Sequence, residues 1–326
     1  MGAARVLVTD TVFPSLEPER AVLAGLAEVE LAPSKDEATL REIAADADAL
    51  LNCYAQLQGD LIRSLRRCRV IARYGIGVDT VDVAAASTAG IMVTNVPDYC
   101  IDEVSDHALA LMLALVRGLV RAVPATRAGT WDLATVRPLR RLRGQTLALI
   151  GFGRIGRAVA AKSAPLGLRI LAYDPYLAPD AIRAGGAEPA DLPSALREAD
   201  ILSIHAPLTS ETRHLIDAAA LEQMKSSAFL VNTARGALVD TRALTAALEA
   251  GRLAGAALDV LESEPPPGDL ELLRLPNVIL TPHSAFYSEE SLIESQTRAA
   301  EEVARVLRGE RPRSLVNDDA LASRSL

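Results

Sequence analysis

Residues 146–156 read TLALIGFGRIG, and this stretch decides the fold. Five strand-forming residues lead directly into a Gly-x-Gly-x-x-Gly motif, and helical spacing begins after it. In such a strand–turn–helix unit the first glycine allows the tight turn, the second lets a pyrophosphate approach the backbone, and the third lets the helix pack closely on the strand. The N–H groups at the start of the helix attract the anion. The stretch therefore predicts a dinucleotide-binding turn, formed by Gly151, Gly153, Arg154, Ile155 and Gly156.

An acidic residue ends the next predicted strand, eighteen residues beyond the last glycine of the motif. This residue is Asp174, in Tyr173-Asp174-Pro175. A carboxylate here can accept hydrogen bonds from both hydroxyls of an adenosine ribose, and it repels a 2′-phosphate. The alternatives are a glycine turn without a ligand and a surface aspartate, but strand, spacing and acid together favour NAD over NADP. The stretch GIGVDT at 75–80 lacks the third glycine, so we expect no second dinucleotide turn there.

Strands and helices alternate along the chain, which predicts an α/β architecture with parallel sheets. After residue 140 we expect strands at 146–150, 169–173, 201–204, 228–231, 255–258 and 278–280, with helices between them, for example at 154–164 and 241–250. In the first hundred residues we expect strands at 5–8, 49–51, 70–72 and 91–93, and helices at 17–27, 36–44, 60–67 and 81–89. These patterns predict two doubly wound parallel-sheet domains.

Two longer helices lie outside the regular alternation. Residues 101–120 are apolar around almost the whole circumference of a helix, so we expect it to be buried in a core or at a subunit interface, and the pattern does not separate the two. The last helix, 288–307, follows the final strand of the second sheet and can return to pack on the first domain. The basic stretch 137–143 is interpreted as a solvated connector.

Composition excludes several classes of protein. The 326 residues suffice for about two domains, and half of them are hydrophobic. A net charge of −8 gives no global attraction to nucleic acid or anionic lipid. The longest apolar run, 108–116, is too short to span a membrane, and the first ten residues lack the apolar core of a signal peptide. The cysteines at 53, 68 and 100 match neither a zinc site nor an even disulfide set, so we expect a cytoplasmic protein without a metal.

Four histidines are candidates for moving a proton. His107 lies in the apolar helix and is expected to be a packed or interface residue, and His214 follows a loop and is expected to be exposed. His205 and His283 both follow strands of the second sheet, at the carboxyl ends where such folds bind ligands. His283, in the sequence TPHS, is the better candidate, because an imidazole titrates near pH ~6.5 and can exchange a proton at neutral pH.

Hydride transfer from NADH to a ketone needs a proton donor for the developing alkoxide, a cation that polarises the carbonyl, and a group that holds the donor's charge state. Residues 231–236, VNTARG, place Arg235 at a strand end. Residues 258–265, LDVLESEP, place carboxylates, Glu264 among them, after the next strand. The structural alternatives for Arg235 and Glu264 are a surface ion pair and a loop acid.

Five motifs together resemble the D-isomer-specific 2-hydroxyacid dehydrogenases, and the resemblance covers nearly the whole chain. They are GFGRIG (151–156), HAPLT (205–209), NTARGALVD (232–240), ALDVLESEP (257–265) and TPHSAFYS (281–288). Within the family the chain is most similar to the C-terminal-binding-protein branch, on YDPY (173–176), AFLVNTARG (228–236) and the end of the last motif (283–288).

The resemblance implies roles for these residues. Arg235 is expected to bind the substrate carboxylate and carbonyl, His283 to act as acid and base, and Glu264 to orient His283. Asp259 is expected to contact the nicotinamide carboxamide. Residues expected to line the cofactor are Ala206, Pro207, Thr212, Thr233 and Ala234. Residues expected to contact the substrate besides Arg235 are Tyr74, Gly75, Ile76 and Phe286.

The resemblance also implies an architecture, a partner and a reaction. A Rossmann NAD domain (99–285) is inserted in a flavodoxin-like substrate domain, which begins with residues 1–98 and is completed by residues 286–326. A homodimer is expected through the helix after residue 100. The expected reaction is a reversible, NAD-dependent hydride transfer between a small 2-oxo acid and its 2-hydroxy acid.

Other functions stay open beside this one. A 3-phosphoglycerate dehydrogenase-like enzyme is the first alternative, although no appended regulatory domain and no cationic phosphate cluster is recognised. An NAD-sensing, corepressor-like binding protein is the second alternative, and the presence of Arg235, Glu264 and His283 together favours an enzyme over it. A formate dehydrogenase is disfavoured because that branch pairs its histidine with Gln, whereas residue 264 is Glu. Phe286 stands where the eukaryotic C-terminal-binding-protein branch has Trp, and Ile76 where it has a small polar residue, so its substrate preference does not carry over.

Overall fold

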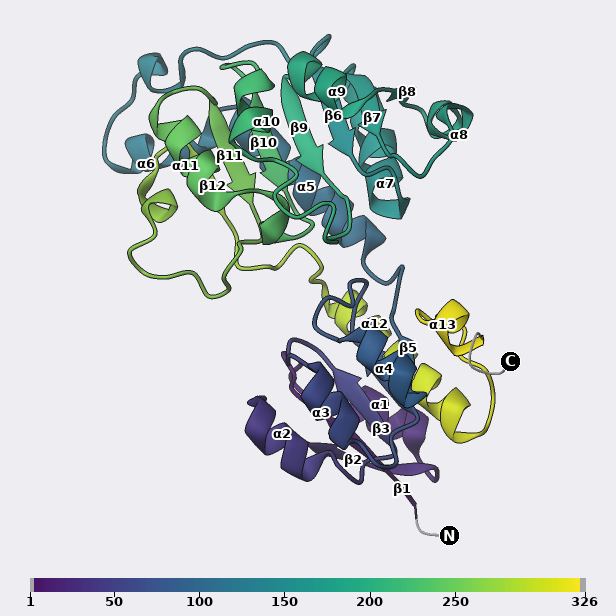
Figure 1. The fold of residues 1–326 in the computed structure, drawn as a ribbon. Helices are drawn as coiled ribbons and strands as arrows, with labels where there is room; N and C mark the ends of the chain where they lie inside the picture. Colours follow the sequence, from purple (N-terminus) through teal and green to yellow (C-terminus); the bar gives the residue numbers. More distant parts are fainter. Residues whose placement is uncertain (1–2, 323–326) are drawn as a thin grey trace. The chain divides into compact units, whose positions relative to one another are not determined.

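Strand β6 (Thr146–Ile150) is formed by the apolar residues that precede the glycine motif, and all five are buried. In the computed structural model, which describes residues 3–322, β6 lies inside a seven-stranded parallel sheet of order β12-β11-β10-β9-β6-β7-β8 (Figure 1). The chain continues from β6 outward to β7 and β8, and then crosses to β9 on the other side of β6. In doubly wound sheets the ligand site lies at the carboxyl ends of the strands next to such a reversal.

The seven-stranded sheet and its helices form the unit of residues 100–287. Its other strands are β7 (Arg169–Tyr173), β8 (Glu188–Pro189), β9 (Ile201–Ile204), β10 (Phe229–Asn232), β11 (Gly255–Leu258) and β12 (Val278–Leu280). Its helices are α5 (Ile101–Val116), α6 (Leu119–Arg127), α7 (Arg154–Ser163), α8 (Pro179–Ala184), α9 (Leu192–Glu198), α10 (Ala218–Gln223) and α11 (Thr241–Glu249). A 3-10 turn, η1 (Leu133–Val136), follows α6.

Helices cover both faces of this sheet. Side chains such as Leu111 and Val159 bury α5 and α7 against one face, and Leu221 and Leu244 bury α10 and α11 against the other. Because the inner strands are covered on both sides, their sequences are continuous apolar runs without alternation. This burial holds the strand ends, and the loops that follow them, in fixed positions.

The second parallel sheet belongs to a unit that ends at Tyr99 and resumes at Ser288. Its strand order is β2-β1-β3-β4-β5, the flavodoxin-like order. The strands are β1 (Ala4–Val8), β2 (Ala27–Leu31), β3 (Ala49–Asn52), β4 (Val70–Arg73) and β5 (Met92–Thr94). The helices are α1 (Glu17–Leu23), α2 (Glu37–Ile43), α3 (Gly59–Ser64), α4 (Val83–Ala89), α12 (Glu289–Leu307) and α13 (Asp318–Ala322). Two parallel-sheet α/β units confirm the predicted fold class.

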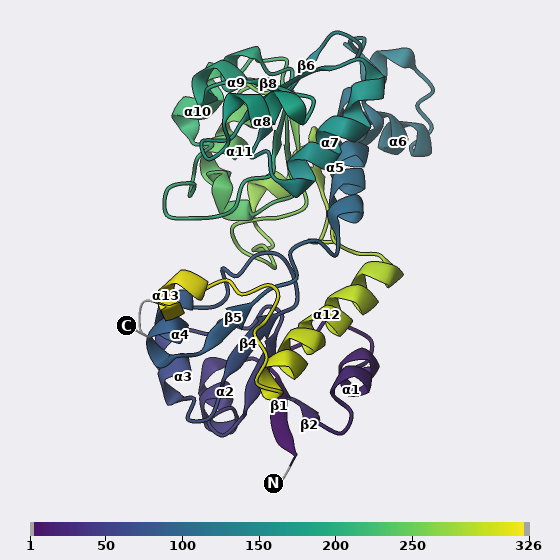
Figure 2. The ribbon, with the colours of Figure 1, turned by 90° about the vertical axis from the view of Figure 1, so that its right-hand side faces the viewer.

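The last long helix, α12, packs against α1 and β4 of this unit (Figure 2). Gln296 on α12 donates through Nε2 to both carboxylate oxygens of the fully buried Glu19 on α1, at 3.0 and 2.9 Å. The chain therefore leaves the first unit at Tyr99 and returns to it with α12. The structural boundaries fall after Tyr99 and after Tyr287, one and two residues later than the expected ones.

The prediction of a helix over 17–27 is wrong at its carboxyl end. Helix α1 ends at Leu23, because Gly25 turns the chain with a φ of +73° and leads it into β2. Among residues 3–322, strand β2 pairs only with β1, so it is an edge strand of the described sheet. Its acidic residues Glu28 and Glu30 are exposed, so β2 contains no continuous apolar run that would predict a strand. The two-residue strand β8 has no counterpart among the expected strands, so the larger sheet described here has seven strands and not the six expected.

The predicted long helix over 101–120 is two helices. Helix α5 ends at Val116, Gly118 adopts the left-handed conformation with a φ of +65°, and α6 continues at a bend of 66°. Helix α5 packs one side on α7, β10 and β11, so the core of its own unit explains that side. On its other side Leu109, Leu113 and Ala114 are half-buried and Ala110 is exposed, so the prediction of an interface there stays open.

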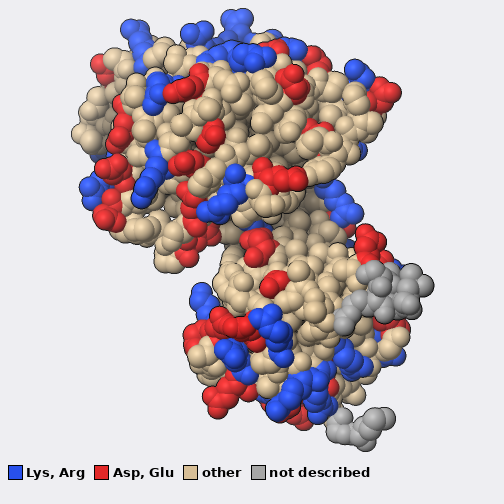
Figure 3. Space-filling view, in the orientation of Figure 1, with Lys and Arg blue, Asp and Glu red and all other residues tan. Residues whose placement is uncertain are grey.

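Two observations bear on the classes of protein that the composition excludes, membrane-spanning and nucleic-acid-binding proteins. Within residues 3–322 no single helix is long and apolar enough to cross a membrane, and the bent pair α5 and α6 meets the criterion by length and composition alone. Acidic and basic side chains are interspersed on the face drawn in Figure 3.

Candidate active site

The glycine turn after β6 has the geometry that its motif requires. Gly151 has a φ of +89°, and a Cβ on it would lie 2.6 Å from the backbone nitrogen of Ala206. A Cβ on Gly156 would lie 2.4 Å from the carbonyl oxygen of Gly151, so α7 packs directly on the turn. No atom lies within 4 Å of a Cβ on Gly153, which leaves the outer side of the turn open. Helix α7 begins here without a side-chain cap, so its first N–H groups are available to an anion.

Asp174 fastens the glycine turn to the end of β7. Its Oδ2 accepts a hydrogen bond from the backbone N–H of Phe152 at 2.9 Å, and its Oδ1 accepts one from Tyr176 at 3.0 Å. Phe152 lies inside the glycine motif, so the carboxylate holds this motif to the end of β7. Carboxylate oxygens have further lone pairs with which to accept the ribose hydroxyls.

The end of β10 presents the predicted cation. The buried Asn232 side chain accepts from the Ala234 N–H at 3.0 Å and donates to the Arg235 carbonyl at 2.8 Å, which shapes the turn that carries Arg235. Thr233 in the same turn is buried, and its hydroxyl has no hydrogen-bond partner among the described residues. A buried hydroxyl without a partner is uncommon, and a bound cofactor would satisfy it. These residues fit NAD.

Gly236 locks this turn against the loop that carries the predicted acid. A Cβ on Gly236 would lie 1.9 Å from the carbonyl carbon of Leu261, so only glycine allows the two backbones to approach. Leu261 donates its N–H to Glu264 Oε1 at 2.9 Å. The positions of Arg235 and Glu264 are thereby linked through backbone packing.

The structure brings the three predicted catalytic residues together. His283 Nδ1 lies 2.6 Å from Glu264 Oε2. Burial by itself raises the pKa of Glu264, but the hydrogen bond and charge of His283 and the charge of Arg235 outweigh it, so the pKa lies below its ordinary value. Glu264 is therefore ionised at neutral pH and acts only as an acceptor, so His283 carries a hydrogen on Nδ1. Nε2 is then the nitrogen of His283 that can exchange a proton with a substrate.

Asp259 organises the segment that carries His283. The carboxylate is 2% exposed and accepts hydrogen bonds from the Thr281 hydroxyl at 2.5 Å, the Ser284 N–H at 2.9 Å and the Ala285 N–H at 2.8 Å. His107 Nε2 lies 3.0 Å from the Thr281 hydroxyl, so this histidine supports the same segment, as a packed residue. The sequence singled out Asp259 through its resemblance to the family, but gave no signal for its contact with Thr281.

The remaining residues that are predicted to line the cofactor lie in the segment after β9. Ala206 and Pro207 follow His205 there, and the Thr212 hydroxyl donates to the Pro207 carbonyl at 2.7 Å. His205 Nε2 lies 2.9 Å from the Ser203 hydroxyl, and burial lowers the pKa of His205 to about 4. His205 is therefore neutral at pH 7.

The predicted substrate residues fall in both units. The Phe286 ring meets the His283 ring edge to face, with centroids 6.1 Å apart, in the unit of residues 100–287. Tyr74, Gly75 and Ile76 belong to the unit that contains β4. The Tyr74 ring is buried and its hydroxyl donates to Glu19 Oε1 at 2.7 Å, so its polar atom serves the packing of its own unit.

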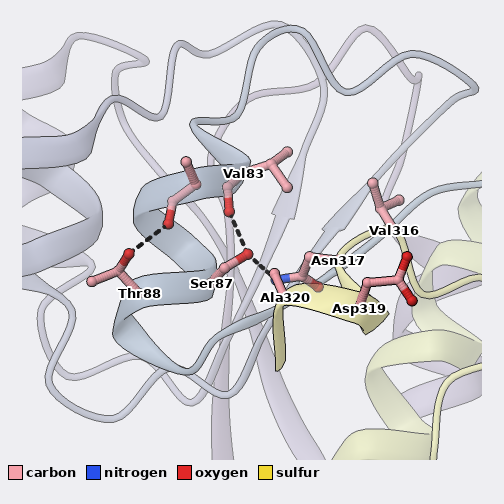
Figure 4. Close-up of a pocket in the computed structure, with 8 residues that line it drawn as sticks. Val83, Ser87, Thr88, Val316, Asn317, Asp319 and Ala320 are labelled. Atoms are coloured by element: carbon pink, nitrogen blue, oxygen red, sulfur yellow. Dashed lines mark hydrogen bonds between the residues drawn. The ribbon is translucent and has the colours of Figure 1, made fainter. Parts of the chain in front are cut away.

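A pocket in the unit of residues up to Tyr99 and from Ser288 lies between α4 and α13 (Figure 4). Ser87 donates to the Val83 carbonyl and accepts from Asn317, so these polar groups bind one another. The pocket does not lie at the strand ends, and we assign it no ligand.

The parallel sheet, the open glycine turn and the histidine–carboxylate pair beside an arginine define a dinucleotide-dependent oxidoreductase. The model of the D-isomer specific 2-hydroxyacid dehydrogenase NAD binding domain matches residues 109–285. The chain belongs to the D-isomer specific 2-hydroxyacid dehydrogenase family. The predicted family, the oxidoreductase function and NAD as the cofactor are thus confirmed.

Named relatives place the chain among reductases and dehydrogenases. The glyoxylate reductase of Korarchaeum cryptofilum is 39% identical over 330 residues, which are 98% of each protein. The D-3-phosphoglycerate dehydrogenase of Methanocaldococcus jannaschii is 39% identical over 315 residues, which are 96% of this chain and 59% of that longer protein. The crystal structure of D-lactate dehydrogenase from Aquifex aeolicus, complexed with NAD and lactic acid, is 28% identical with a TM-score of 0.86, over 94% of this chain and 96% of that one.

Proposed function

We propose that this protein reduces glyoxylate or another small 2-oxo acid with NADH, using Arg235, Glu264 and His283. The observation that carries the proposal is the 2.6 Å contact between His283 Nδ1 and Glu264 Oε2, beside the charge of Arg235. A glyoxylate reductase that aligns over 98% of this chain supports the choice of a small substrate.

Each residue has a distinct part in this reaction. NADH, when bound, supplies the hydride. Arg235 binds the substrate carboxylate and polarises the carbonyl, since a guanidinium can form two parallel hydrogen bonds to a carboxylate. His283 donates the Nε2 proton to the developing alkoxide. Glu264 holds the ring through Nδ1 and stabilises its positive charge before the proton leaves.

The cofactor is held by the chain's own glycine turn and by Asp174. The turn and the start of α7 offer N–H groups to the pyrophosphate, and Asp174 accepts from the ribose hydroxyls. Thr233, Ala234, Ala206, Pro207 and Thr212 line the nicotinamide side.

The test is an NADH-oxidation screen with glyoxylate, hydroxypyruvate, pyruvate, phenylpyruvate and 3-phosphohydroxypyruvate. We expect glyoxylate or hydroxypyruvate to have the highest kcat/KM. Because Phe286 packs against His283, Phe286→Ala should weaken turnover of the best apolar substrate and leave NADH binding unchanged. No oxidation of NADH with any of the five acids would refute the proposal.

The second candidate function is 3-phosphoglycerate dehydrogenase. It is favoured by a relative of that name with 39% identity, although this chain spans 59% of its length. The screen separates the two, because this function requires 3-phosphohydroxypyruvate to be the best substrate. The C-terminal-binding-protein branch and a corepressor-like role stay predictions from the sequence, as does a cytoplasmic location.

We further propose that the protein is a homodimer. Helix α5 buries only one side in its own unit, and α6 after it has no buried residue. Leu119, Trp131 and Leu133 in and after α6 are 49%, 91% and 66% exposed. An apolar surface of this kind is typical of an interface. Light scattering should give about twice the chain mass of 34.5 kDa, and the single-chain mass for a Trp131→Ser, Leu133→Ser double variant. A wild-type protein of single-chain mass would refute the dimer.

A further inference from the structure

A second histidine–glutamate pair joins the loop that carries Glu264 to the segment after β9. His214 Nε2 is 2.6 Å from Glu262 Oε1, the same separation as between His283 Nδ1 and Glu264 Oε2. His214 and His283 have φ values of +54° and +51°, and no other non-glycine residue of the described chain has a positive φ. Such a conformation costs energy in a residue with a Cβ, and it persists where surrounding contacts impose it.

His214 belongs to the segment that is proposed to line the cofactor. Its backbone N–H donates to the Ala237 carbonyl at 2.8 Å, which places it beside the turn after Arg235. Upstream, the Thr212 hydroxyl bonds to the Pro207 carbonyl and closes the loop. The backbone of His214 therefore belongs to the loop that is proposed to line the cofactor, and its imidazole reaches across to Glu262 in the loop after β11.

Glu262 is held on two sides at the far end of this contact. Its Oε1 meets His214, and its Oε2 accepts the N–H of Thr241 at the start of α11, at 3.0 Å. Although burial raises the pKa of Glu262, these hydrogen bonds outweigh it, so the carboxylate stays ionised. The other charged groups here are Arg213, 3.9 Å from Glu262, and Asp240, 4.0 Å from His214 Nδ1.

The position of Glu262 bears directly on Glu264. Leu261, the residue before Glu262, packs its backbone on Gly236 and donates its N–H to Glu264 Oε1. A loop that shifts at Glu262 therefore changes the position from which Glu264 reaches His283.

We propose that His214 is a positioning residue for proton transfer: by holding Glu262 it fixes the loop 259–264, so that Glu264 reaches His283, and it ties this loop to the segment that lines the cofactor. This inference rests on the proposed roles of Glu264 and His283.

Three substitutions separate the side-chain contact from the backbone conformation. His214→Asn keeps a residue that tolerates the left-handed region, but its side chain is too short to reach Glu262. His214→Gln places an amide nitrogen that can donate to Glu262. Arg213→Gln is the matched control, since Arg213 lies on the same loop, is 59% exposed and only approaches Glu262 at 3.9 Å.

The readout is kcat and KM for NADH-dependent reduction of the best 2-oxo acid, with the NADH dissociation constant from fluorescence. We expect His214→Asn to lower kcat about tenfold with the NADH dissociation constant nearly unchanged, and His214→Gln to restore most of kcat. The pH profile of kcat should shift in the same direction as in Glu264→Gln. Adding His214→Asn to Glu264→Gln should cost nothing more, because the histidine acts through that glutamate.

Three results would overturn the inference: wild-type kcat in His214→Asn, no rescue by His214→Gln, or losses that multiply in the double variant. Amide hydrogen exchange over residues 259–264, measured on the protein alone, tests it independently of activity. We expect faster exchange in His214→Asn and wild-type exchange in His214→Gln and Arg213→Gln. If the wild type reduces no 2-oxo acid, the proposed function fails, whereas the exchange experiment still decides whether His214 holds the loop.

Discussion

Replacing Asp174 by Asn separates two functions that the structure gives to one carboxylate. The carboxylate accepts hydrogen bonds from the N–H groups of Phe152 and Tyr176, and it is proposed to accept the ribose hydroxyls of NADH as well. Asn keeps one acceptor oxygen but removes the charge. Its NH2 group then faces one of the two backbone N–H groups, which loses its hydrogen-bond acceptor. A hydrogen bond to a charged group is worth about 1.5–3 kcal/mol.

The expected effects follow from this count of contacts. Loss of one backbone hydrogen bond should lower Tm by about 3–12 °C, at roughly 2–4 °C per kcal/mol for a domain of this size. Loss of charge-assisted bonds to the ribose should weaken NADH binding about ten- to a hundredfold. NADPH binding should weaken less or improve, because the charge that repels a 2′-phosphate is gone. Asp174→Ala removes both backbone bonds, so it should lower Tm further and weaken both cofactors.

The assay is fluorescence titration with NADH and with NADPH, with Tm measured in parallel. Asp180→Asn is the control, because it removes one carboxylate from the same unit at a side chain that is 95% exposed. The same loss of affinity for both cofactors in Asp174→Asn would show that Asp174 only fastens the turn and does not read the ribose.

Three further outcomes are expected. His283→Ala should lower kcat about 10²–10⁴-fold, and adding Glu264→Gln should cost little more, so additive losses in the double variant would contradict the orienting role of the acid. His205 has a pKa near 4 in the folded protein against about 6.5 when unfolded, so its neutral form stabilises the fold above pH 6.5 and up to about 3 kcal/mol is lost as the pH falls towards 4. Urea unfolding of the wild type and of His205→Gln at pH 7 and pH 4 checks this. If both proteins lose the same free energy of unfolding between pH 7 and pH 4, the prediction is contradicted. Gly236→Ala should destabilise the protein by about 2 kcal/mol and lower kcat, whereas Gly268→Ala, with no atom within 4 Å of the new Cβ, should change neither Tm nor kcat.

Prediction from the sequence worked where local chemistry decides the structure. The strand–turn–helix unit around Gly151 depends on contacts within a few residues, so its residue types determine its backbone. The inner strands were recognised because burial on both faces demands apolar side chains throughout. The edge strand β2 was not recognised, since its exposed acidic residues leave no such pattern.

The pairing of side chains from separate loops was decided by the tertiary structure. The sequence determined which residues are proposed to carry the chemistry: a glycine turn, an acid after β7, an arginine after β10, and a histidine after β12. It did not show that Glu262 meets His214, that Asp259 accepts from Thr281, or that Asp174 holds the glycine turn. These contacts join residues 22 to 48 positions apart, and only the packing of β6, β7, β9, β11 and β12 into one sheet brings the segments that follow them together. A hydrogen bond depends on separations of about 3 Å, which are set by the burial of a whole sheet and not by the identity of the two residues that form it.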